Sequence, residues 1–408
     1  MATTLTKWPR TKVKHLAEYI TVGFVGSMSH LFCDDGVPLL RGQNIKPYSL
    51  DLSNLKFISL ETHRKWKKSA LLPGDVAIVR VGYPGTACVI PEGIGNLNAA
   101  SLVIVRPDKK LLDSKFFCYV INSPWGKSQV LGRLVGSAQQ VFNTQTAADL
   151  EIPAPPLPTQ RKIAGILSAY DDLIENNLRR IKILEEMAQS LYREWFVHFR
   201  FPSHESARFI DSELGQIPKG WEIKKLGELA DQMRRGVPKG ELDGPIRYVG
   251  LEHIPRQSLA LDAWEEKNEL GSNKLTFERG EVLFGKIRPY FHKVSVAPFD
   301  GICSADTIVI RSKKPEYRAL VTACVFTEAF VAHATATSNG SKMPRTDWKV
   351  LKDYPHVLPP KELLTRFSAL FENAVAQQQN LVSRNQTLRS TRNLLLPKLL
   401  QNGPLLKP

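Results

Sequence analysis

Two short segments of the chain contain residue types that could perform chemistry. Pro107-Asp108 followed by Asp113-Ser114-Lys115 imitates the carboxylate and lysine motif with which many nucleases hold a metal ion. Asn122-Ser123-Pro124-Trp125 is a faint echo of the loop with which adenine methyltransferases hold a flipped base. The two nuclease-like halves are too close in sequence to lie on neighbouring strands, and no glycine-rich cofactor loop accompanies the second segment. We therefore interpret these segments as an ordinary charged turn and a helix-ending turn.

The other common catalytic and metal-binding patterns are absent from the sequence. There is no Walker loop, no His-Glu-x-x-His motif and no Gly-x-Ser-x-Gly elbow. The nine histidines are scattered, and the five cysteines lack the Cys-x-x-Cys spacing of redox or zinc sites. The sequence thus predicts no catalytic residue and no metal site, and it favours a binding protein.

The strongest bulk signal is charge. The chain has 55 Lys and Arg against 40 Asp and Glu, a net charge of +15, which indicates a polyanionic partner such as nucleic acid or an anionic membrane surface. No apolar run approaches the length of a membrane span, and the first residues lack the pattern of a secretory signal. With 408 residues, we expect a cytoplasmic protein of two or more domains.

The chain contains a long internal repeat. Residues 155–196 align with residues 359–400 at a constant offset of 204 without gaps. Upstream of these segments, residues 13–18 resemble residues 223–228, and residues 72–76 resemble residues 278–282. Each half of the chain is therefore expected to be a domain followed by the repeated segment.

The repeated segments are expected to be long helices with apolar seams. Each follows prolines, and the apolar positions alternate spacings of four and three. The first seam comprises Ile163, Leu167, Tyr170, Ile174, Asn177, Ile181, Leu184, Ala188, Leu191 and Trp195. The second comprises Phe367, Phe371, Ala374, Gln378, Leu381, Asn385, Leu388, Arg392, Leu395 and Leu399. Three amide side chains interrupt the seams, and each either fixes the helix register or faces solvent: Asn177, Gln378 and Asn385.

These elements predict a mixed α/β (α+β) chain with a two-fold internal repeat. Short runs rich in Val and Ile, at residues 76–81, 101–105 and 307–310, are bounded by Gly and Pro and indicate strands. The expected domains are a first domain at 1–155, a central helix at 156–200, a linker and second domain at 201–358, and a distal helix at 359–408. The linker is expected at residues 202–219, where turn-forming residues show little periodicity.

The order of these parts resembles the specificity (S) subunit of Type I restriction-modification systems. Two local signatures carry the resemblance: residues 157–168 (LPTQRKIAGILS), which open the central helix, and residues 215–221 (GQIPKGW), which open the second half. The sequence departs from the family pattern where the first domain lacks a Pro-Lys-Gly-Trp opening. It also departs at the distal helix, which begins Pro360-Lys361-Glu362-Leu363.

The resemblance implies two target recognition domains that each read one half of a bipartite double-stranded DNA sequence, joined by two helices that pair as an antiparallel coiled coil. It also implies a non-catalytic subunit that directs two methyltransferase (M) subunits and the restriction (R) subunits. S-adenosylmethionine would then be bound by the methyltransferase, and ATP and Mg by the restriction subunit, with no cofactor on this chain. The first seam spans about 48 Å, enough to hold two readers over grooves about 34 to 36 Å apart.

Candidate DNA contacts are loop residues that mix Arg or Lys with amides and aromatic rings, because Arg pairs with guanine and Asn or Gln with adenine in the major groove. In the first domain they are Arg41, Gln43, Asn44, Arg80, Tyr83, Gln139, Gln140 and Asn143. In the second they are Lys286, Arg288, Tyr290, Lys342 and Arg345. The loops at 136–143 and 340–345 occupy equivalent places in the repeat. For each residue a phosphate contact or a solvated loop competes with base recognition.

Two other classes of protein remain open from the residues alone. One is an enzyme whose site follows no common motif. The other is a coiled-coil scaffold or regulator that binds DNA without guiding a methyltransferase.

Overall fold

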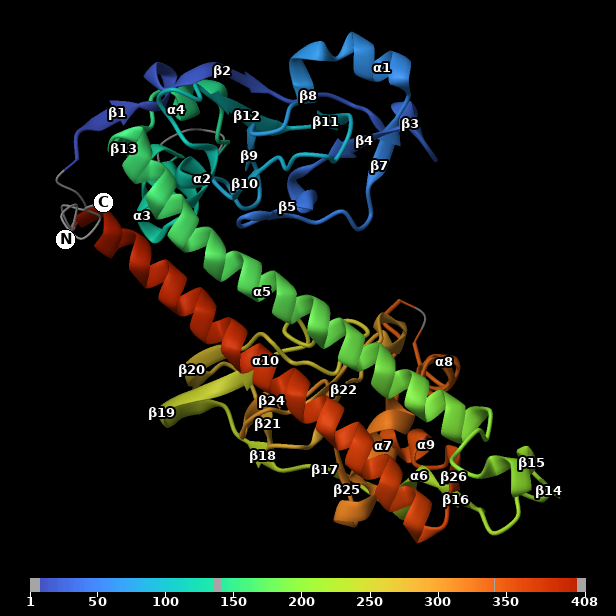
Figure 1. Cartoon of the computed structure of the whole chain (residues 1–408). Helices are drawn as coiled ribbons and strands as arrows, with labels where there is room; N and C mark the ends of the chain where they lie inside the picture. Colours follow the sequence, from blue (N-terminus) through green and yellow to red (C-terminus); the bar gives the residue numbers. More distant parts are fainter. Residues whose placement is uncertain (1–7, 135–140, 341, 402–408) are drawn as a thin grey trace. The chain divides into compact units, whose positions relative to one another are not determined.

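The computed structural model describes residues 8–134, 141–340 and 342–401 of the chain (Figure 1). The chain forms two compact units. Unit 1 comprises residues 1–174 and 388–408, and unit 2 comprises residues 175–387. Two long helices, α5 (Leu157–Tyr192) and α10 (Lys361–Gln401), each contribute residues to both units.

Unit 1 is a mixed α/β domain with the first part of α5 and the last part of α10. Its other elements are β1 (Arg10–Lys12), β2 (Ala17–Val22), β3 (Phe32–Cys33), β4 (Val37–Leu40), β5 (Ile45–Lys46), β6 (Ser49–Leu50), β7 (Lys56–Ile58), α1 (Leu60–Lys65), β8 (Ala70–Leu71), β9 (Val76–Val79), β10 (Ala87–Val89), β11 (Leu97–Ala99), β12 (Leu102–Pro107), α2 (Ser114–Asn122), α3 (Pro124–Leu134), α4 (Thr144–Ala148) and β13 (Glu151–Pro153).

Three layers build unit 1. A four-stranded sheet of order β10-β9-β12-β2 packs on one face against α2 and on the other against a five-stranded sheet of order β3-β7-β4-β11-β8. The side chains of strand β9 point alternately to the two faces of the four-stranded sheet. Val76 and Ile78 belong to the core between this sheet and α2, whereas Ala77 and Val79 belong to the core between the two sheets. An uninterrupted apolar strand is the pattern expected where both faces of a sheet are buried.

Unit 2 repeats this construction. Its elements are β14 (Phe209–Ser212), β15 (Gly215–Pro218), β16 (Glu222–Lys225), α6 (Leu226–Leu229), β17 (Ala230–Met233), β18 (Gly236–Val237), β19 (Gly240–Val249), β20 (Glu265–Leu270), β21 (Lys274–Phe277), β22 (Val282–Gly285), β23 (Val294–Val296), β24 (Gly301–Ser304), β25 (Thr307–Ser312), α7 (Arg318–Val325), α8 (Glu328–Ala336), α9 (Trp348–Leu351) and β26 (Pro355–Leu358).

The sheets of unit 2 follow the order of those in unit 1. The order β23-β22-β25-β17 matches β10-β9-β12-β2, and the pair β16-β26 matches β1-β13. In both five-stranded sheets one parallel pair interrupts antiparallel pairing, β4 with β11 in unit 1 and β19 with β24 in unit 2. The two five-stranded sheets differ at their edges, because β3 is the added edge strand next to β7 in unit 1 and β18 is the added edge strand next to β21 in unit 2. The repeat inferred from the sequence is therefore a repeat of topology.

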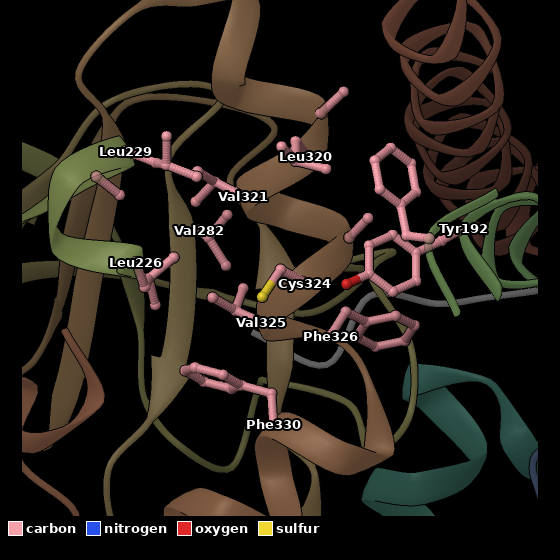
Figure 2. Packing of buried hydrophobic residues seen from close by; sticks show 14 of the residues in the cluster. Tyr192, Leu226, Leu229, Val282, Leu320, Val321, Cys324, Val325, Phe326 and Phe330 are labelled. Carbon is pink, nitrogen blue, oxygen red and sulfur yellow. The ribbon is translucent and has the colours of Figure 1, made fainter. Parts of the chain in front are cut away.

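The core of unit 2 joins the domain to α5. Figure 2 shows side chains of α6, β22, α7 and α8 packed together, with the ring of Tyr192 from α5 among them and its hydroxyl directed towards Cys324. Burial raises the pKa of the Cys324 thiol to about 12, so this group remains a neutral part of the core. The helix is thus built into the hydrophobic core of the domain.

An ion pair between a buried carboxylate and a partly exposed arginine recurs at the same place in both units. In unit 1 the Asp75 carboxylate accepts hydrogen bonds from Nε of Arg106 at 2.8 Å and from a backbone N–H three residues earlier, also at 2.8 Å. In unit 2 the Glu281 carboxylate accepts from Nε of Arg311 at 2.7 Å and from the backbone N–H three residues earlier at 2.7 Å. Each pair ties the turn before the central strand to the neighbouring strand, which supports the alignment of residues 72–76 with 278–282.

The helix seams are confirmed, since every predicted seam position is buried or half-buried. In unit 1, Ile163 and Leu167 of α5 share one hydrophobic core with Leu396 and Leu400 of α10. This core also contains residues of α2, so the end of the distal helix completes the first domain.

In unit 2 the two helices pack against each other in opposite directions. Nδ2 of Asn177 donates a hydrogen bond of 2.8 Å to Oδ1 of Asn385. In the π-helical turn that continues α5 at Arg193–Val197, the ring of Trp195 lies 6.0 Å from that of Phe367. Residue numbers therefore rise along one helix as they fall along the other. Both asparagines are buried, so they pair within the seam and do not face solvent.

The segment at 202–219, which was expected to be a linker, is a folded part of unit 2, and this prediction was wrong. Strands β14 and β15 form a hairpin, and the buried side chains of Phe201, Ile217 and Trp221 belong to the core. The polar and turn residues that suggested a linker lie around this hairpin.

Across the described ranges, no single helix is both long and apolar enough to span a membrane. One sharply bent pair, Pro315–Val325 with Glu328–Ala336, meets the length and composition test.

Candidate nucleic-acid interface

In unit 2, two loops that are far apart in sequence lie side by side. The connection from β22 to β23 contains Lys286, Arg288 and Tyr290, and its backbone pairs with the loop before α9. The N–H of Arg288 donates to the carbonyl of Pro344 at 2.7 Å, and the N–H of Thr346 donates to the carbonyl of Lys286 at 3.1 Å. Three of the predicted contacts thus lie on one loop, next to the loop that carries Lys342 and Arg345.

The β22–β23 connection has an unusual backbone. Arg288 and His292 adopt left-handed conformations, with φ of 49° and 51°, on either side of a 3-10 turn at Pro289–Phe291. Such strain persists only where surrounding contacts fix it, and it is frequent at functional sites. One such contact is between Nε2 of His292 and the carbonyl oxygen of Phe326, 2.9 Å apart. Burial lowers the pKa of His292, which favours the neutral ring that donates this bond.

The turn presents aromatic and basic side chains together. Tyr290 is half exposed, and its ring lies 4.9 Å from that of Phe291. The guanidinium carbons of Arg256 and Arg288 lie 3.9 Å and 5.9 Å from the centre of the Phe291 ring. Sequence reasoning did not identify Arg256, because it follows a separate strand, β19, and nothing local links it to residues 288–291.

Unit 1 has the same pair of loops. After β9, the N–H of Phe142 donates to the carbonyl of Arg80 at 3.1 Å, and Nε of Arg80 donates to the carbonyl of Phe142 at 3.3 Å. Tyr83 lies in the β9–β10 connection, as Tyr290 does in the β22–β23 connection, and it is 83% exposed. Each unit therefore projects an exposed tyrosine from the equivalent place.

The loop before α4 is equivalent to the loop before α9, as predicted. Asn143 is exposed and caps α4, where its side chain accepts the N–H of Thr146 at 2.8 Å. In unit 2 the side chain of Asp347 caps α9. Two of the predicted contacts, Gln139 and Gln140, lie outside the described residues.

Asn44 has a structural role that argues against the predicted DNA contact. It is 1% exposed, and its Oδ1 accepts the N–H of Arg41 at 3.1 Å while its Nδ2 donates to the carbonyl of Asp51 at 3.0 Å. Arg41 is half-buried and donates to the carbonyl of Asn54 at 3.0 Å. Of the three residues predicted in this turn, Gln43 is the one that is exposed.

The equivalent turn of unit 2 contributes Glu252 and His253 to a group that could hold a metal ion, and the start of β20 contributes Glu265. This is the one cluster of three potential metal ligands in the described part of the chain. However, Nδ1 of His253 accepts the N–H of Gly250 at 2.9 Å, as Asn44 does for Arg41. The proton of the neutral ring is therefore on Nε2, which lies 3.6 Å from Glu265. A protonated nitrogen does not bind a metal, so the turn cap explains His253.

The two segments that imitated catalytic motifs also have structural roles. The Asp108 side chain accepts the N–H of Lys110 at 2.8 Å in a turn, and Asp113 caps α2 by accepting the N–H of Phe116 at 2.9 Å. Asn122 ends α2, and its buried amide is bonded to the backbone of Ala87. These contacts agree with the interpretation of both segments as turns.

The chain is thus a tandem-domain protein: it contains two copies of one mixed α/β domain, each joined to a pair of antiparallel helix segments and each presenting the same two loops. Residues 54–186 match the family model described as the Type I restriction modification DNA specificity domain. This match covers about a third of the chain, and it places residues 54–186 with the DNA specificity domains of Type I restriction-modification systems.

Named relatives agree with this placement. The chain is similar to the Type I restriction enzyme MjaIX specificity subunit of Methanocaldococcus jannaschii, with 27% identity over 278 residues, 65% of this chain and 63% of that protein. It is also similar to the EcoDI specificity subunit of Escherichia coli, with 25% identity over 66% of this chain and 68% of that protein. The chain therefore spans less than two thirds of the length of the first relative.

The fold has a counterpart among solved structures. The crystal structure of a Type I restriction-modification S subunit from M. genitalium matches with a TM-score of 0.57 over 98% of this chain and 97% of that chain, at 15% sequence identity. At this identity the match concerns the fold.

Proposed function

We propose that this chain is the DNA-reading subunit of a Type I restriction-modification complex. Each unit would read one half of a bipartite target, and the chain would direct adenine methyltransferase and restriction subunits to it. The observation that carries the proposal is that both units present the same pair of loops, at residues 80–86 with 141–143 and at residues 286–293 with 342–346, with different side chains. Shared framework with different loops is what two readers of different sequences require.

The charges support DNA as the ligand. The net charge of +15 favours phosphates through attraction and counterion release. Exposed Lys342 and Arg345, beside half-buried Lys286, give the loops of unit 2 the donors that phosphates and guanine accept. The exposed rings of Tyr83 and Tyr290 offer apolar surface that can contact apolar groups of DNA such as the thymine methyl.

The chemistry is proposed to belong to partner subunits. This chain would bind no cofactor itself, whereas S-adenosylmethionine would be bound by two methyltransferase subunits, and ATP and Mg by restriction subunits. The chain would be a non-catalytic, cytoplasmic subunit. Adenine methylation would be the activity of the partner, because an S subunit only selects the place at which its partner acts.

Purification of the full chain from its native host tests this proposal. We expect methyltransferase and restriction subunits to co-purify with the tagged chain, and labelled S-adenosylmethionine to mark DNA only when they are present. Methyl transfer or cleavage by the rigorously purified chain alone would identify an enzyme with its own site. DNA binding without any methyltransferase partner would identify a scaffold or regulator.

A further inference from the structure

Arg256 of unit 2 is an exposed arginine held over an aromatic ring. Its guanidinium carbon lies 3.9 Å from the centre of the half-buried Phe291 ring. The backbone fixes this arrangement, because Arg256 and Lys293 form an antiparallel bridge and the N–H of Gln257 donates to the carbonyl of His292 at 2.8 Å. The side chain is therefore positioned before any ligand binds.

Within the described part of the chain, the hydrogen-bonding groups of the Arg256 side chain have no partner. Over the ranges that the structure describes, its guanidinium has no carboxylate or carbonyl partner, whereas Arg345 in the neighbouring loop lies 3.9 Å from the carboxylate of Asp306. A stack on a ring covers the face of a guanidinium and leaves its five N–H donors at the edge. Arg256 thus presents a planar set of donors whose orientation the ring restricts.

The surroundings of Arg256 match a ligand that is both anionic and aromatic. Phe291 lies in the β22–β23 connection, which also carries Arg288 and Tyr290 and in which Arg288 and His292 have left-handed backbone conformations. Arg256 thus lies at the loops that the proposed function assigns to DNA, although it comes from a separate segment of the chain.

We propose that Arg256 recognises a guanine in the half-site read by unit 2, with its edge donors bound to O6 and N7 in the major groove. This proposal rests on the proposed function and adds a specificity-determining residue to it. A bidentate pair of this kind requires a planar fork, and a preoriented fork loses less rotamer freedom when it binds. Lysine also binds phosphate, as a point charge without the planar fork.

Lysine substitution distinguishes the two roles. Arg256→Lys keeps the charge and loses the fork, and Arg256→Ala loses both. Phe291→Leu keeps Arg256 and removes the ring that orients it. Arg247→Lys is the matched control, because Arg247 is an exposed arginine of β19 whose guanidinium lies 4.7 Å from the centre of the Phe299 ring, outside the loops. Thermal melting of each variant checks its fold.

The readout is the sequence of duplexes captured from a randomised library by the tagged full chain together with its co-purifying partners. For Arg256→Lys and Arg256→Ala we expect the preference for G at one position to fall about 5- to 150-fold, with all other positions unchanged. Phe291→Leu should weaken the same position by less, and Arg247→Lys should retain the wild-type motif.

Three results would overturn the assignment: a wild-type motif retained by Arg256→Lys, a uniform loss of capture across all positions, or a changed position that is not a G·C pair. The proposed function is tested separately by the wild-type chain. If the wild-type protein enriched no bipartite motif, the proposed function would fail, and the role of Arg256 would fail with it.

Discussion

The end of the distal helix is tied to the first domain by a half-buried ion pair, and its removal gives a sharp test of the fold. Arg392 of α10 forms an ion pair with Asp171 of α5, and their side chains are 11% and 23% exposed. The Arg392 guanidinium carbon also lies 4.1 Å from the centre of the Tyr48 ring, and the hydroxyl of Tyr119 donates to Asp171. Burial raises the pKa of Tyr48 to about 12, so the ring beneath the cation stays neutral.

Among the described residues, Arg392→Met would leave the Tyr119 hydroxyl as the one donor to the Asp171 carboxylate, in a largely buried site. Breaking a fully buried pair costs about 3 to 5 kcal/mol, and the remaining exposure of this pair reduces the electrostatic part of that cost. Loss of the stack on Tyr48 adds about 1 kcal/mol. We therefore expect unit 1 to lose about 3 kcal/mol. The double variant with Asp171→Asn should lose less than the sum of the single variants, because it leaves no unpaired charge.

Hydrogen exchange of the full chain measures this effect where it occurs. A loss of about 3 kcal/mol corresponds to roughly 100-fold faster exchange of the amides at residues 388–400, with unit 2 unchanged. Arg389→Met is the matched control, because Arg389 lies on the same helix and the described structure gives it no ion pair. If Arg392→Met accelerated exchange by no more than the control, the distal helix would not be held by this pair, and the reasoning would be refuted.

Three further predictions concern stability and spacing. Burial lowers the pKa of His356 to about 4, so the folded chain keeps this ring neutral. The free energy of unfolding should therefore fall by about 3 kcal/mol as the pH drops from about 6.5 to about 4. Urea unfolding of His356→Gln should show a flatter pH profile over this range, and a profile identical to that of the wild type would contradict the assignment. Asn177→Leu alone should lower the free energy of unfolding by about 1 to 3 kcal/mol because it leaves Asn385 unpaired. Thermal melting of the variant with Leu at both positions should show that most of this loss is recovered. Additive losses would show that the two asparagines are not coupled. Deleting residues 178–184 together with 378–384 keeps the Asn177–Asn385 pair and the apolar seam while it shortens both helices by about 10 Å. Methylation mapping should then show a DNA spacer changed by about three base pairs between unchanged half-sites. An unchanged spacer in an active complex would mean that the helices do not set its length.

The repeat and the helix seams could be predicted because their signals are local. A seam repeats every three or four residues, and the structure buries or half-buries each of its positions. The amides Asn177 and Asn385, whose direction the sequence left open, are buried. The strands at 76–79 and 307–312 were visible for the same reason, as short apolar runs bounded by turns.

The loops could be predicted only in part, because long-range backbone contacts assemble them. Asn44 and Gln43 look alike in sequence, yet the fold turns one inwards as a turn cap and leaves the other exposed. Arg256 meets Phe291 only because two distant segments pair through Lys293, and the hairpin at 209–218 depends on core contacts of Ile217. No local periodicity encodes such pairings.

The central claim is that each unit reads its own half of one bipartite DNA target. The most direct measurement is a methylation map of cells that carry the partner subunits and a chain whose residues 1–150 come from a relative of different specificity. The account predicts that one half of the methylated sequence changes to that of the donor, while the other half and the spacer stay the same. A change in both halves, or in neither half of an active complex, would contradict it.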